Sequence, residues 1–311
     1  MREACLDQVY EAAKKDERVF FIGSDLGVNT LKKFKQEMPG RFFMEGISEQ
    51  HVVGMASGLA LEGKIVYVNT ISTFLTRRCF EQVVVDVCLH NLNVRLIGNG
   101  GGLVYAPLGP THLAIEDISI MRAIPNMTVG APADADEMRR LMPQTVDHLG
   151  PIYIRLAKGY DPIVTTDEIP FRIGRALPMR EGGDALLVTT GVTLKLALEA
   201  AKGLAVEGVE CSVLHMPTVK PLDIDALLAR ATITPVIITI EENTTIGGLG
   251  SAVAEALAEA DFNSVKRFRR IGIPDQFAKR YGTQANLMEH YRISTVEIIA
   301  TVKHLRALCA N

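Results

Sequence analysis

Short apolar runs rich in β-branched residues alternate with helical patterns along most of this 311-residue chain. Consecutive parallel strands need a crossover connection, so this alternation is the strongest constraint on the fold, and it predicts an α/β domain with helices on both faces of a mainly parallel sheet. The runs that predict buried strands in the first half are Val19–Gly23, Lys64–Asn69, Val94–Gly98 and Pro151–Leu156. The helical patterns between them lie near Ser48–Leu61, Thr76–Asn91, Ala114–Ala123 and Asp134–Leu149.

The pattern fades between Gly159 and Asp184, where prolines, glycines and charged residues predict a linker with one short strand. A second alternating series follows. Its predicted strands are Ala185–Thr190, Val209–Met216, Pro235–Glu241 and Phe268–Ile273, and its predicted helices are Thr193–Glu207 and Leu249–Ala260. We therefore expect two doubly wound domains, at residues 1–160 and 185–311, with a linker at residues 161–184.

Composition argues against several classes of partner. Apolar residues make up 48% and charged residues 22% of the chain, and the net charge is -3, so neither a nucleic acid nor an anionic membrane surface is expected as a partner. No apolar run approaches the roughly 18 residues that span a bilayer. The five cysteines are not closely paired and the seven histidines lack the spacing of zinc ligands. We expect a reduced, cytoplasmic protein with no metal site made by this chain alone.

Residues 41–63, RFFMEGISEQHVVGMASGLALEG, predict a strand end or turn at Arg41–Gly46, followed by an amphipathic helix. Ser48 is expected as the N-cap residue, with its hydroxyl accepting hydrogen bonds from the free amides of the first turn. Glu49 then lies in that turn, where the helix dipole favours a carboxylate. Acidic residues are common there, so these residues alone leave both a structural and a functional role open. Gly54 and Gly58 fit close packing against another helix, either within the chain or across a subunit interface.

We expect a ligand site in the loops that follow the predicted parallel strands, because ligands collect at that edge of open parallel sheets. These loops are Ser24–Thr30, Asn69–Arg78, Asn99–His112 and Ala157–Tyr160. The glycine run at residues 98–102 lacks the GxGxxG spacing, and the prolines after it prevent a helix, so it does not favour a dinucleotide site. A second run, at residues 247–251, fits either a tight turn or an anion site at a helix start.

Several long motifs resemble one family. ISEQHVVGMASGLALEG, NTISTFLTRRCFEQV, GPTHLAIEDISIMRAIPNMTV and GPIYIRL resemble the pyrimidine-binding domain of transketolases and their relatives, which use thiamine diphosphate. HMPTVKPLD, EENTTIGGLGSAVAE and FAKRYGTQANLMEHY resemble the transketolase C-terminal domain. Single-chain members also carry a domain with a GDG…N motif that binds the cofactor diphosphate and Mg²⁺, and no GDG occurs here. The resemblance therefore implies one subunit of a split transketolase, whose partner, the N-terminal subunit, supplies the diphosphate and Mg²⁺ site in an α2β2 heterotetramer.

The resemblance also implies roles for residues near the cofactor. Glu49 matches the carboxyl group that hydrogen-bonds a nitrogen of the cofactor's pyrimidine and favours the imino tautomer, whose nitrogen removes the thiazolium proton. Phe74 matches an aromatic residue that stacks on the pyrimidine, and Phe80 is a second candidate for lining that pocket. Asp25 matches an acidic position near the pyrimidine amino group. Core packing is the alternative for both phenylalanines, and a turn or capping role is the alternative for Asp25.

Other matches concern the substrate. His112, in GPTH, matches a histidine that contacts the substrate and shuttles protons, although a lone histidine is more often structural. Arg155 and Lys158 match basic residues that hold a substrate phosphate, with a surface salt bridge as the alternative. Common sugar-phosphate transketolases have GEDGPTH, with an Asp that contacts a donor hydroxyl where this chain has Leu108. Arg77, a predicted cofactor contact, stands where many transketolases have an aromatic residue and the related deoxyxylulose-phosphate synthases have Arg.

From this resemblance we expect a transferase of carbohydrate metabolism. With its partner it would move a two-carbon ketol unit from a ketose or ketose phosphate to an aldehyde. Arg77 and Leu108 leave room for a decarboxylating relative that acts on pyruvate or another 2-oxo acid, either like deoxyxylulose-phosphate synthase or like a 2-oxo acid dehydrogenase β-subunit. A catalytically silent assembly partner is a further alternative, which the presence of Glu49, Phe74 and His112 opposes.

Overall fold

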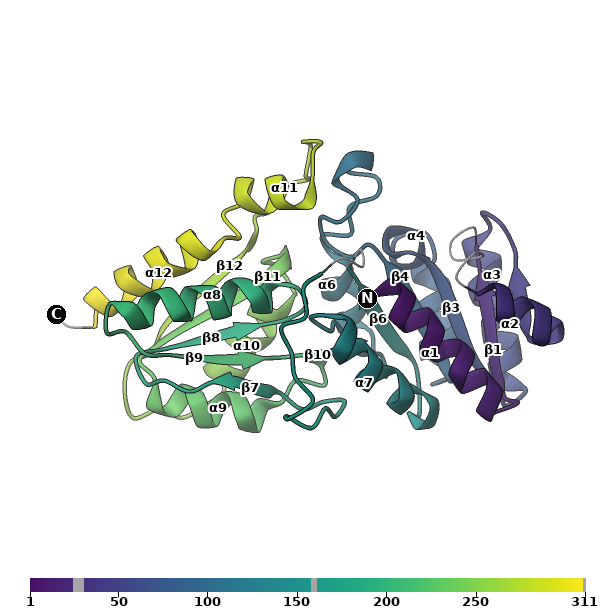
Figure 1. Cartoon of the computed structure of the whole chain (residues 1–311), viewed down its shortest axis with the longest axis horizontal. Coiled ribbons are helices and arrows are strands. Elements are labelled where there is room, and N and C mark those ends of the chain that lie inside the picture. Colours follow the sequence, from purple (N-terminus) through teal and green to yellow (C-terminus); the bar gives the residue numbers. More distant parts are fainter. Residues whose placement is uncertain (25–30, 158–160, 310–311) are drawn as a thin grey trace.

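The computed structural model describes residues 1–24, 31–157 and 161–309. Two sheets lie side by side in an elongated molecule (Figure 1). The first sheet contains β1 (Val19–Gly23), β2 (Phe42–Met44), β3 (Ile65–Ile71), β4 (Val94–Asn99), β5 (Thr128–Gly130), β6 (Ile152–Leu156) and β10 (Thr218–Lys220). The second contains β7 (Leu177–Arg180), β8 (Ala185–Thr189), β9 (Cys211–His215), β11 (Val236–Thr244) and β12 (Arg267–Ile273).

The expected parallel topology is confirmed in both sheets. The strand order is β10-β5-β6-β4-β3-β1-β2 in the first sheet and β12-β11-β8-β9-β7 in the second. One edge strand of each sheet is antiparallel: β10 against β5 and β7 against β9. The interior strands β3, β4, β6, β8 and β9 are buried along their whole length, which explains why each reads as a continuous apolar run instead of an alternating one.

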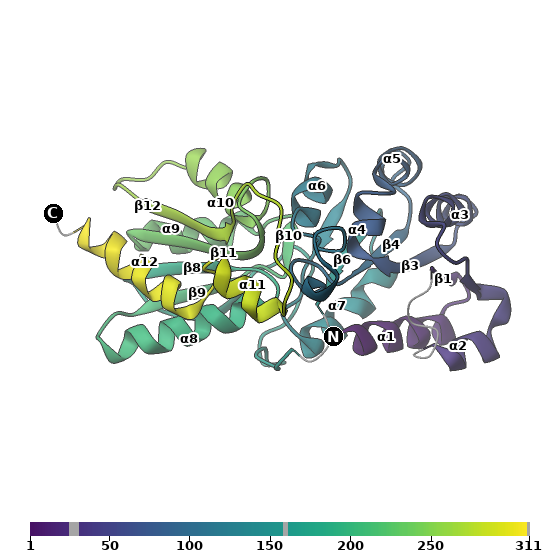
Figure 2. The same ribbon diagram turned by 90° about the horizontal axis from the view of Figure 1, so that it is seen from above.

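Helices cover both faces of each sheet (Figure 2). On the first sheet, one face carries α1 (Arg2–Lys15), α2 (Lys32–Glu37) and α7 (Ala135–Asp147), and the other carries α3 (Glu49–Leu61), α4 (Ser72–Thr76), α5 (Phe80–Gln82) and α6 (Asp117–Ala123). On the second sheet, α8 (Thr193–Val206) and α12 (Thr295–Ala307) face α9 (Ile224–Ile233) and α10 (Leu249–Ala258) across the strands, and α11 (Gln284–His290) lies beside the first domain. Short turns of other pitch are η1 (Pro39–Arg41), η2 (Val83–Cys88) and η3 (Ala106–Leu108). Within the described ranges, no helix combines the length and apolarity needed to cross a bilayer.

Two predicted helices differ from the observed ones. The helix expected at Thr76–Asn91 instead begins at Ser72, breaks after Thr76, and continues as α5 and the π-helical turn η2. The Thr76 hydroxyl donates to the Ser72 carbonyl, a contact that bends helices, and the following run of valines crowds a regular helix. The helix expected from Ala114 begins at Asp117, because Ala114 forms β-bridges with the glycine run.

A strand pairing, a shared apolar core and hydrogen bonds join the two domains. β10 comes from the second half of the sequence but pairs with β5 in the first sheet, with Thr218 opposite Gly130. One cluster of buried apolar side chains runs from α3 and α6 to α10, and so crosses from one domain to the other. Hydrogen bonds hold the chain between the domains against the first domain. Asp134, the N-cap of α7, accepts hydrogen bonds from the amides of Val164 and Thr165, both within the predicted linker. β7 lies in that linker too, as the one short strand expected there.

Candidate active site

The predicted site loops follow adjacent strands. β6, β4, β3 and β1 are neighbours in that order, and their parallel pairing brings their carboxyl ends to one edge of the first sheet. The loops after β3 and β4 are described in full, and they carry most of the candidate residues. Asp25 and Lys158, in the loops after β1 and β6, lie outside the described residues.

Glu49 is the first residue of α3, and its side chain is almost fully buried, with 1% of its surface exposed. Its Oε2 accepts a hydrogen bond from Nη1 of Arg78 at 2.5 Å. The helix dipole and this ion pair together make the buried carboxylate tolerable. Ser48 is the N-cap residue, as predicted, but the predicted capping bond is wrong: its hydroxyl donates to the carbonyl of Glu45 at 2.7 Å and accepts nothing from the helix.

Phe74 and His112 join Glu49 through Arg78. The guanidinium carbon of Arg78 lies 4.0 Å from the centroid of the Phe74 ring. The Phe74 ring meets the imidazole of His112 edge to face, with their centroids 5.2 Å apart. We call Glu49, Arg78, Phe74 and His112 the Glu49 group. Sequence reasoning missed Arg78, and the only available signal was the pair of adjacent arginines in STFLTRR.

Arg77 faces a different carboxylate. It forms an ion pair with Glu116, and its Nη2 donates to the carbonyl of Leu113 at 2.8 Å. Its Nη1 donates to the carbonyl of Pro110 at 3.3 Å. These contacts hold the loop that carries His112 on both sides of the histidine. The described contacts therefore give Arg77 a loop-positioning role, and its predicted contact with a cofactor stays a prediction.

Two apolar candidates are open to solvent. Phe80 begins α5 and is 39% exposed, and Leu108 ends η3 and is 50% exposed. The alternative of Phe80 as a fully buried core residue is therefore wrong, whereas its predicted place in a cofactor pocket stays a prediction. Leu108 lies on the same loop as His112, whose Nδ1 is 2.9 Å from the hydroxyl oxygen of Thr111.

Arg155 lies in an unexpected environment. Its side chain is buried, its Nε donates to Asp117 at 2.9 Å, and its Nη2 donates to the carbonyl of Glu242 at 2.7 Å. Burial raises the pKa of Asp117, a carboxyl that also accepts from the Tyr153 hydroxyl at 2.7 Å. The surface salt bridge considered for Arg155 is therefore wrong. These contacts support a structural tie between the domains, and the predicted grip on a substrate phosphate stays a prediction.

Both glycine runs have structural explanations. A Cβ added at Gly101 would overlap the Arg155 side chain, and one at Gly102, which has φ of +66°, would overlap Glu242. Close packing thus requires the first run. In the second run, the amides of Leu249 and Gly250 at the start of α10 both donate to Glu241 at 2.8 Å. The anion at that helix start is the protein's own carboxylate.

Comparisons with known proteins match both halves of the chain. The family model described as "Transketolase, pyrimidine binding domain" matches residues 1–160, and the model described as "Transketolase, C-terminal domain" matches residues 174–298. The 6-deoxy-6-sulfo-D-fructose transketolase subunit SqwH of Clostridium sp. is 38% identical over 96% of this chain and 92% of that protein. The 1-deoxy-D-xylulose-5-phosphate synthase 1 of Geobacter sulfurreducens is 40% identical over 96% of this chain, which spans only 46% of the synthase.

A solved structure described as "Split gene transketolase, inactive beta4 tetramer" superposes on nearly the whole chain. The TM-score is 0.90 with 35% identity, over 99% of this chain and 98% of that chain. The similarity therefore includes both domains and their arrangement, in a relative that is likewise about the length of this chain.

Proposed function

Because this chain belongs to the transketolase family, we propose that it is the pyrimidine-binding subunit of a split, thiamine-diphosphate-dependent transketolase. With its partner it transfers a two-carbon ketol unit from a ketose or ketose phosphate to an aldehyde acceptor. The observation that carries the proposal is the Glu49 group: a buried carboxylate, an aromatic ring and an imidazole connected by contacts at the carboxyl edge of the first sheet.

The chemistry of the group suits the pyrimidine end of thiamine diphosphate. Glu49 offers a desolvated carboxyl for a ring nitrogen, and Phe74 offers a ring for stacking. The hydroxyl of Thr73, next to Phe74, is buried and has no hydrogen-bond partner within the described part of the chain, so it is free to accept from an amino group. When bound, the cofactor supplies the carbon nucleophile that no side chain of this protein can provide.

Each residue of the group then has a distinct task. Glu49 would hold a proton at the pyrimidine nitrogen, and Phe74 would stack on the ring. His112 moves protons at the substrate hydroxyls from the loop that Arg77 holds. The guanidinium of Arg78 pairs with Glu49 and lies over the Phe74 ring, on which the pyrimidine would stack.

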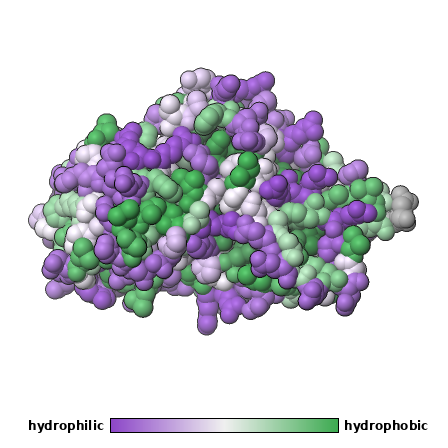
Figure 3. Space-filling model, turned by 180° about the vertical axis from the view of Figure 1, so that it is seen from behind, coloured by the Kyte–Doolittle hydropathy of each residue, from purple (hydrophilic) through white to green (hydrophobic). Residues whose placement is uncertain are grey.

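An exposed apolar face next to the Glu49 group supports a partner subunit. α3 contacts both α5 and η2, and exposed apolar side chains gather on these elements: Leu61, Phe80 and Val85. Green patches lie among the purple on the first domain, at the left of Figure 3. Gly54 and Gly58 are exposed with nothing within 4 Å of a Cβ built on either, so α3 can approach another backbone closely. In our proposal this face meets other subunits of an α2β2 assembly, in which the N-terminal subunit holds the diphosphate and Mg²⁺.

The donor is open to a second interpretation. Arg77 and the 40% identity to a deoxyxylulose-phosphate synthase favour a relative that decarboxylates pyruvate. We rank this second, because the relative with 38% identity over 96% of this chain and 92% of its own length is named as a transketolase subunit. Leu108 stands where common transketolases have an Asp that contacts a hydroxyl of the ketose donor. Losing that contact weakens selection for the hydroxyl by about 1–3 kcal/mol and suits a donor other than the common ketose phosphates. The 6-deoxy-6-sulfo sugar named for that relative is one such candidate.

The test is reconstitution. We expect the chain to be inactive alone, and to transfer ketol units when it is co-purified with an N-terminal transketolase subunit and supplied with thiamine diphosphate and Mg²⁺. Ketol transfer from unphosphorylated, phosphorylated and sulfonated ketoses would be measured in parallel with CO₂ release from pyruvate. Pyruvate-dependent CO₂ release would reverse the ranking. A complex that binds no thiamine diphosphate in calorimetry would instead indicate a silent assembly partner.

A further inference from the structure

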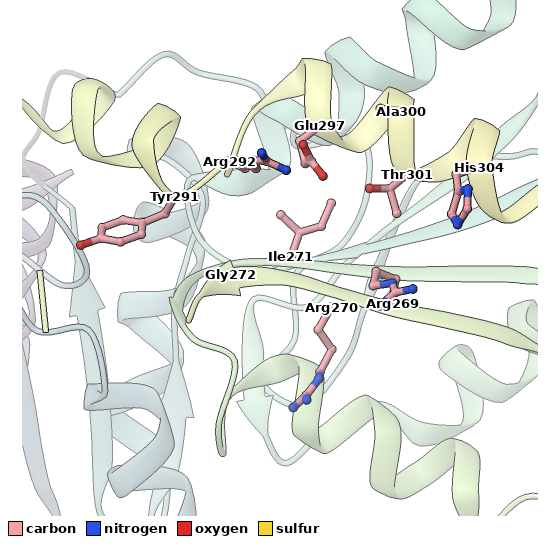
Figure 4. A pocket seen from close by; sticks show the side chains of 10 residues that line it. All are labelled: Arg269, Arg270, Ile271, Gly272, Tyr291, Arg292, Glu297, Ala300, Thr301 and His304. Atoms are coloured by element: carbon pink, nitrogen blue, oxygen red, sulfur yellow. The ribbon is translucent and has the colours of Figure 1, made fainter. Parts of the chain in front are cut away.

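A cleft in the second domain lies away from the Glu49 group. It opens between the edge strand β12 and helix α12, with a volume of about 470 Å³, within the range of small-molecule sites (Figure 4). Its walls come from β12, from the turn after α11, and from α12. Figure 1 places α12 and β12 at the opposite end of the molecule from α3.

Two arginines and a histidine lie around this cleft. Arg269 comes from β12, Arg292 from the turn after α11, and His304 from α12. All three are exposed, and none forms an ion pair within the described residues. Figure 4 shows Arg292 and His304 above the opening and Arg269 below it. Thr301 adds a hydroxyl, and Glu297 is the one acid among the residues that line the cleft.

The backbone conformation at Arg292 is one that favours glycine. Its φ is +57°, in the left-handed region, at the position just after the C-cap of α11. Its amide bonds the carbonyl of Glu289 at 2.9 Å, and the next amide bonds the carbonyl of Met288 at 2.8 Å, the arrangement in which glycine usually ends a helix. A side chain with a Cβ costs about 1–2 kcal/mol in this conformation. The strain indicates that the arginine side chain itself has a task.

Arg270 provides an internal contrast. It neighbours Arg269 on β12, so its side chain points to the opposite face of the strand. There its Nη1 donates to the carbonyl of Thr245 at 2.5 Å, on the side of α10. Figure 4 shows Arg270 directed away from the cleft. Of these two adjacent arginines, Arg270 therefore hydrogen-bonds within the protein, whereas the Arg269 side chain lies beside the cleft.

We propose that this cleft binds a small phosphate-bearing anion, with Arg269 and Arg292 as its main contacts and His304 and Thr301 as further donors. Guanidinium groups bind phosphate oxygens in pairs of parallel hydrogen bonds, and two of them from separate elements fix an anion between them. The site needs neither the Glu49 group nor a partner subunit, so it stands or falls independently of the proposed transketolase activity.

Isothermal titration calorimetry on the full chain with inorganic pyrophosphate tests this site, at about 0.15 M salt so that diffuse surface charge is screened. We expect the unaltered chain to bind, and Arg269→Gln and Arg292→Gly each to weaken binding by about tenfold or more, since each removes charge-assisted hydrogen bonds. Arg292→Gly should also raise the unfolding temperature, because glycine relieves the backbone. Arg270→Gln, the matched control, should bind within about twofold of the unaltered chain.

The proposal is overturned by any of three results. These are no binding by the unaltered chain, unchanged binding in both cleft variants, or an equal loss in Arg270→Gln, which would indicate general attraction to positive charge. Glu49→Gln must retain binding, since a loss there would place the pyrophosphate in the first domain. If Arg292→Gly lowers the unfolding temperature, Arg269→Gln decides the outcome alone.

Discussion

Two buried glutamates, Glu49 and Glu242, are held in opposite ways. Glu242, at the domain junction, accepts hydrogen bonds from the amide of Leu103 and the side chain of Gln284, both at 2.8 Å. Among the residues that the structure describes, Glu49 has one partner, Arg78, whose side chain is 35% exposed. A carboxyl group surrounded by donors from two domains stabilises their arrangement. One that is held by a single, partly hydrated cation can exchange that cation for a ligand, which is the role that we propose for Glu49.

Substituting Glu49 should give the largest effect. We expect Glu49→Gln to lower kcat of the reconstituted complex by about 10²–10⁴-fold, because the amide cannot hold the same proton. The unfolding free energy of the chain should change by less than about 1 kcal/mol, since water can solvate the released Arg78. The measurements are steady-state ketol transfer and urea unfolding. Retained activity with full cofactor dependence would refute the role of Glu49, and Glu242→Gln is the matched control.

Removing the contacts of Arg155 between the domains should mainly lower the free energy of unfolding. Arg155→Ala leaves Asp117 buried without its cation, so we expect the unfolding free energy to fall by about 3–5 kcal/mol. Urea denaturation of the isolated chain measures this loss. A variant with unchanged stability and a raised KM only for phosphorylated substrates would restore Arg155 as a phosphate-binding residue.

Arg77 should give a smaller, indirect effect. In Arg77→Gln the loop with His112 loses its tie to Glu116, and we expect kcat to fall by about tenfold. Both side chains of this ion pair are about 30% exposed, so stability should fall by no more than about 1 kcal/mol. Arg77→Lys, which keeps the charge, should recover part of kcat. A change confined to KM for thiamine diphosphate would instead identify Arg77 as a cofactor contact.

The effect that is spread over the widest range of conditions concerns the pH dependence of stability. Burial raises the pKa of Glu242 to about 7, from 4.5 for the free group. Between these values the folded chain keeps a proton that the unfolded chain has released, so this contribution to stability is complete below about pH 4.5 and is lost as the pH rises to about 7. Glu242→Gln keeps an oxygen for both donors but cannot titrate.

The unfolding free energy of the Glu242→Gln variant should therefore decline less steeply over this pH range than that of the unaltered chain, by up to about 1.4 kcal/mol per pH unit. Chemical denaturation in a series of buffers measures both slopes. Identical slopes would show that Glu242 does not keep its proton in the folded state. Glu241, whose pKa burial also raises to about 7, should still contribute its own slope in the variant.

The sequence by itself determined the α/β class, most strands, the helix start at Glu49 and, through long motifs, the family. Apolar periodicity and N-cap chemistry reflect the local backbone, so these features can be predicted from neighbouring residues. The interior strand β5 and the edge strand β10 were not predicted, and β2 lies where only a strand end or turn was predicted. Each of these three strands has only three residues and owes its pairing to distant partners.

Tertiary structure alone decided which charged side chains meet. Arg77 and Arg78 are adjacent in sequence, and the break after α4 sends one to Glu116 and the other to Glu49. Likewise, the fold of the first domain brings Arg155 of β6 against Asp117 of α6, and only the packing of the second domain adds the Glu242 carbonyl to its partners. A residue type specifies the interactions that a side chain can make. Its partner is chosen by the three-dimensional course of the chain, because contacts between distant residues depend on the packing of whole elements.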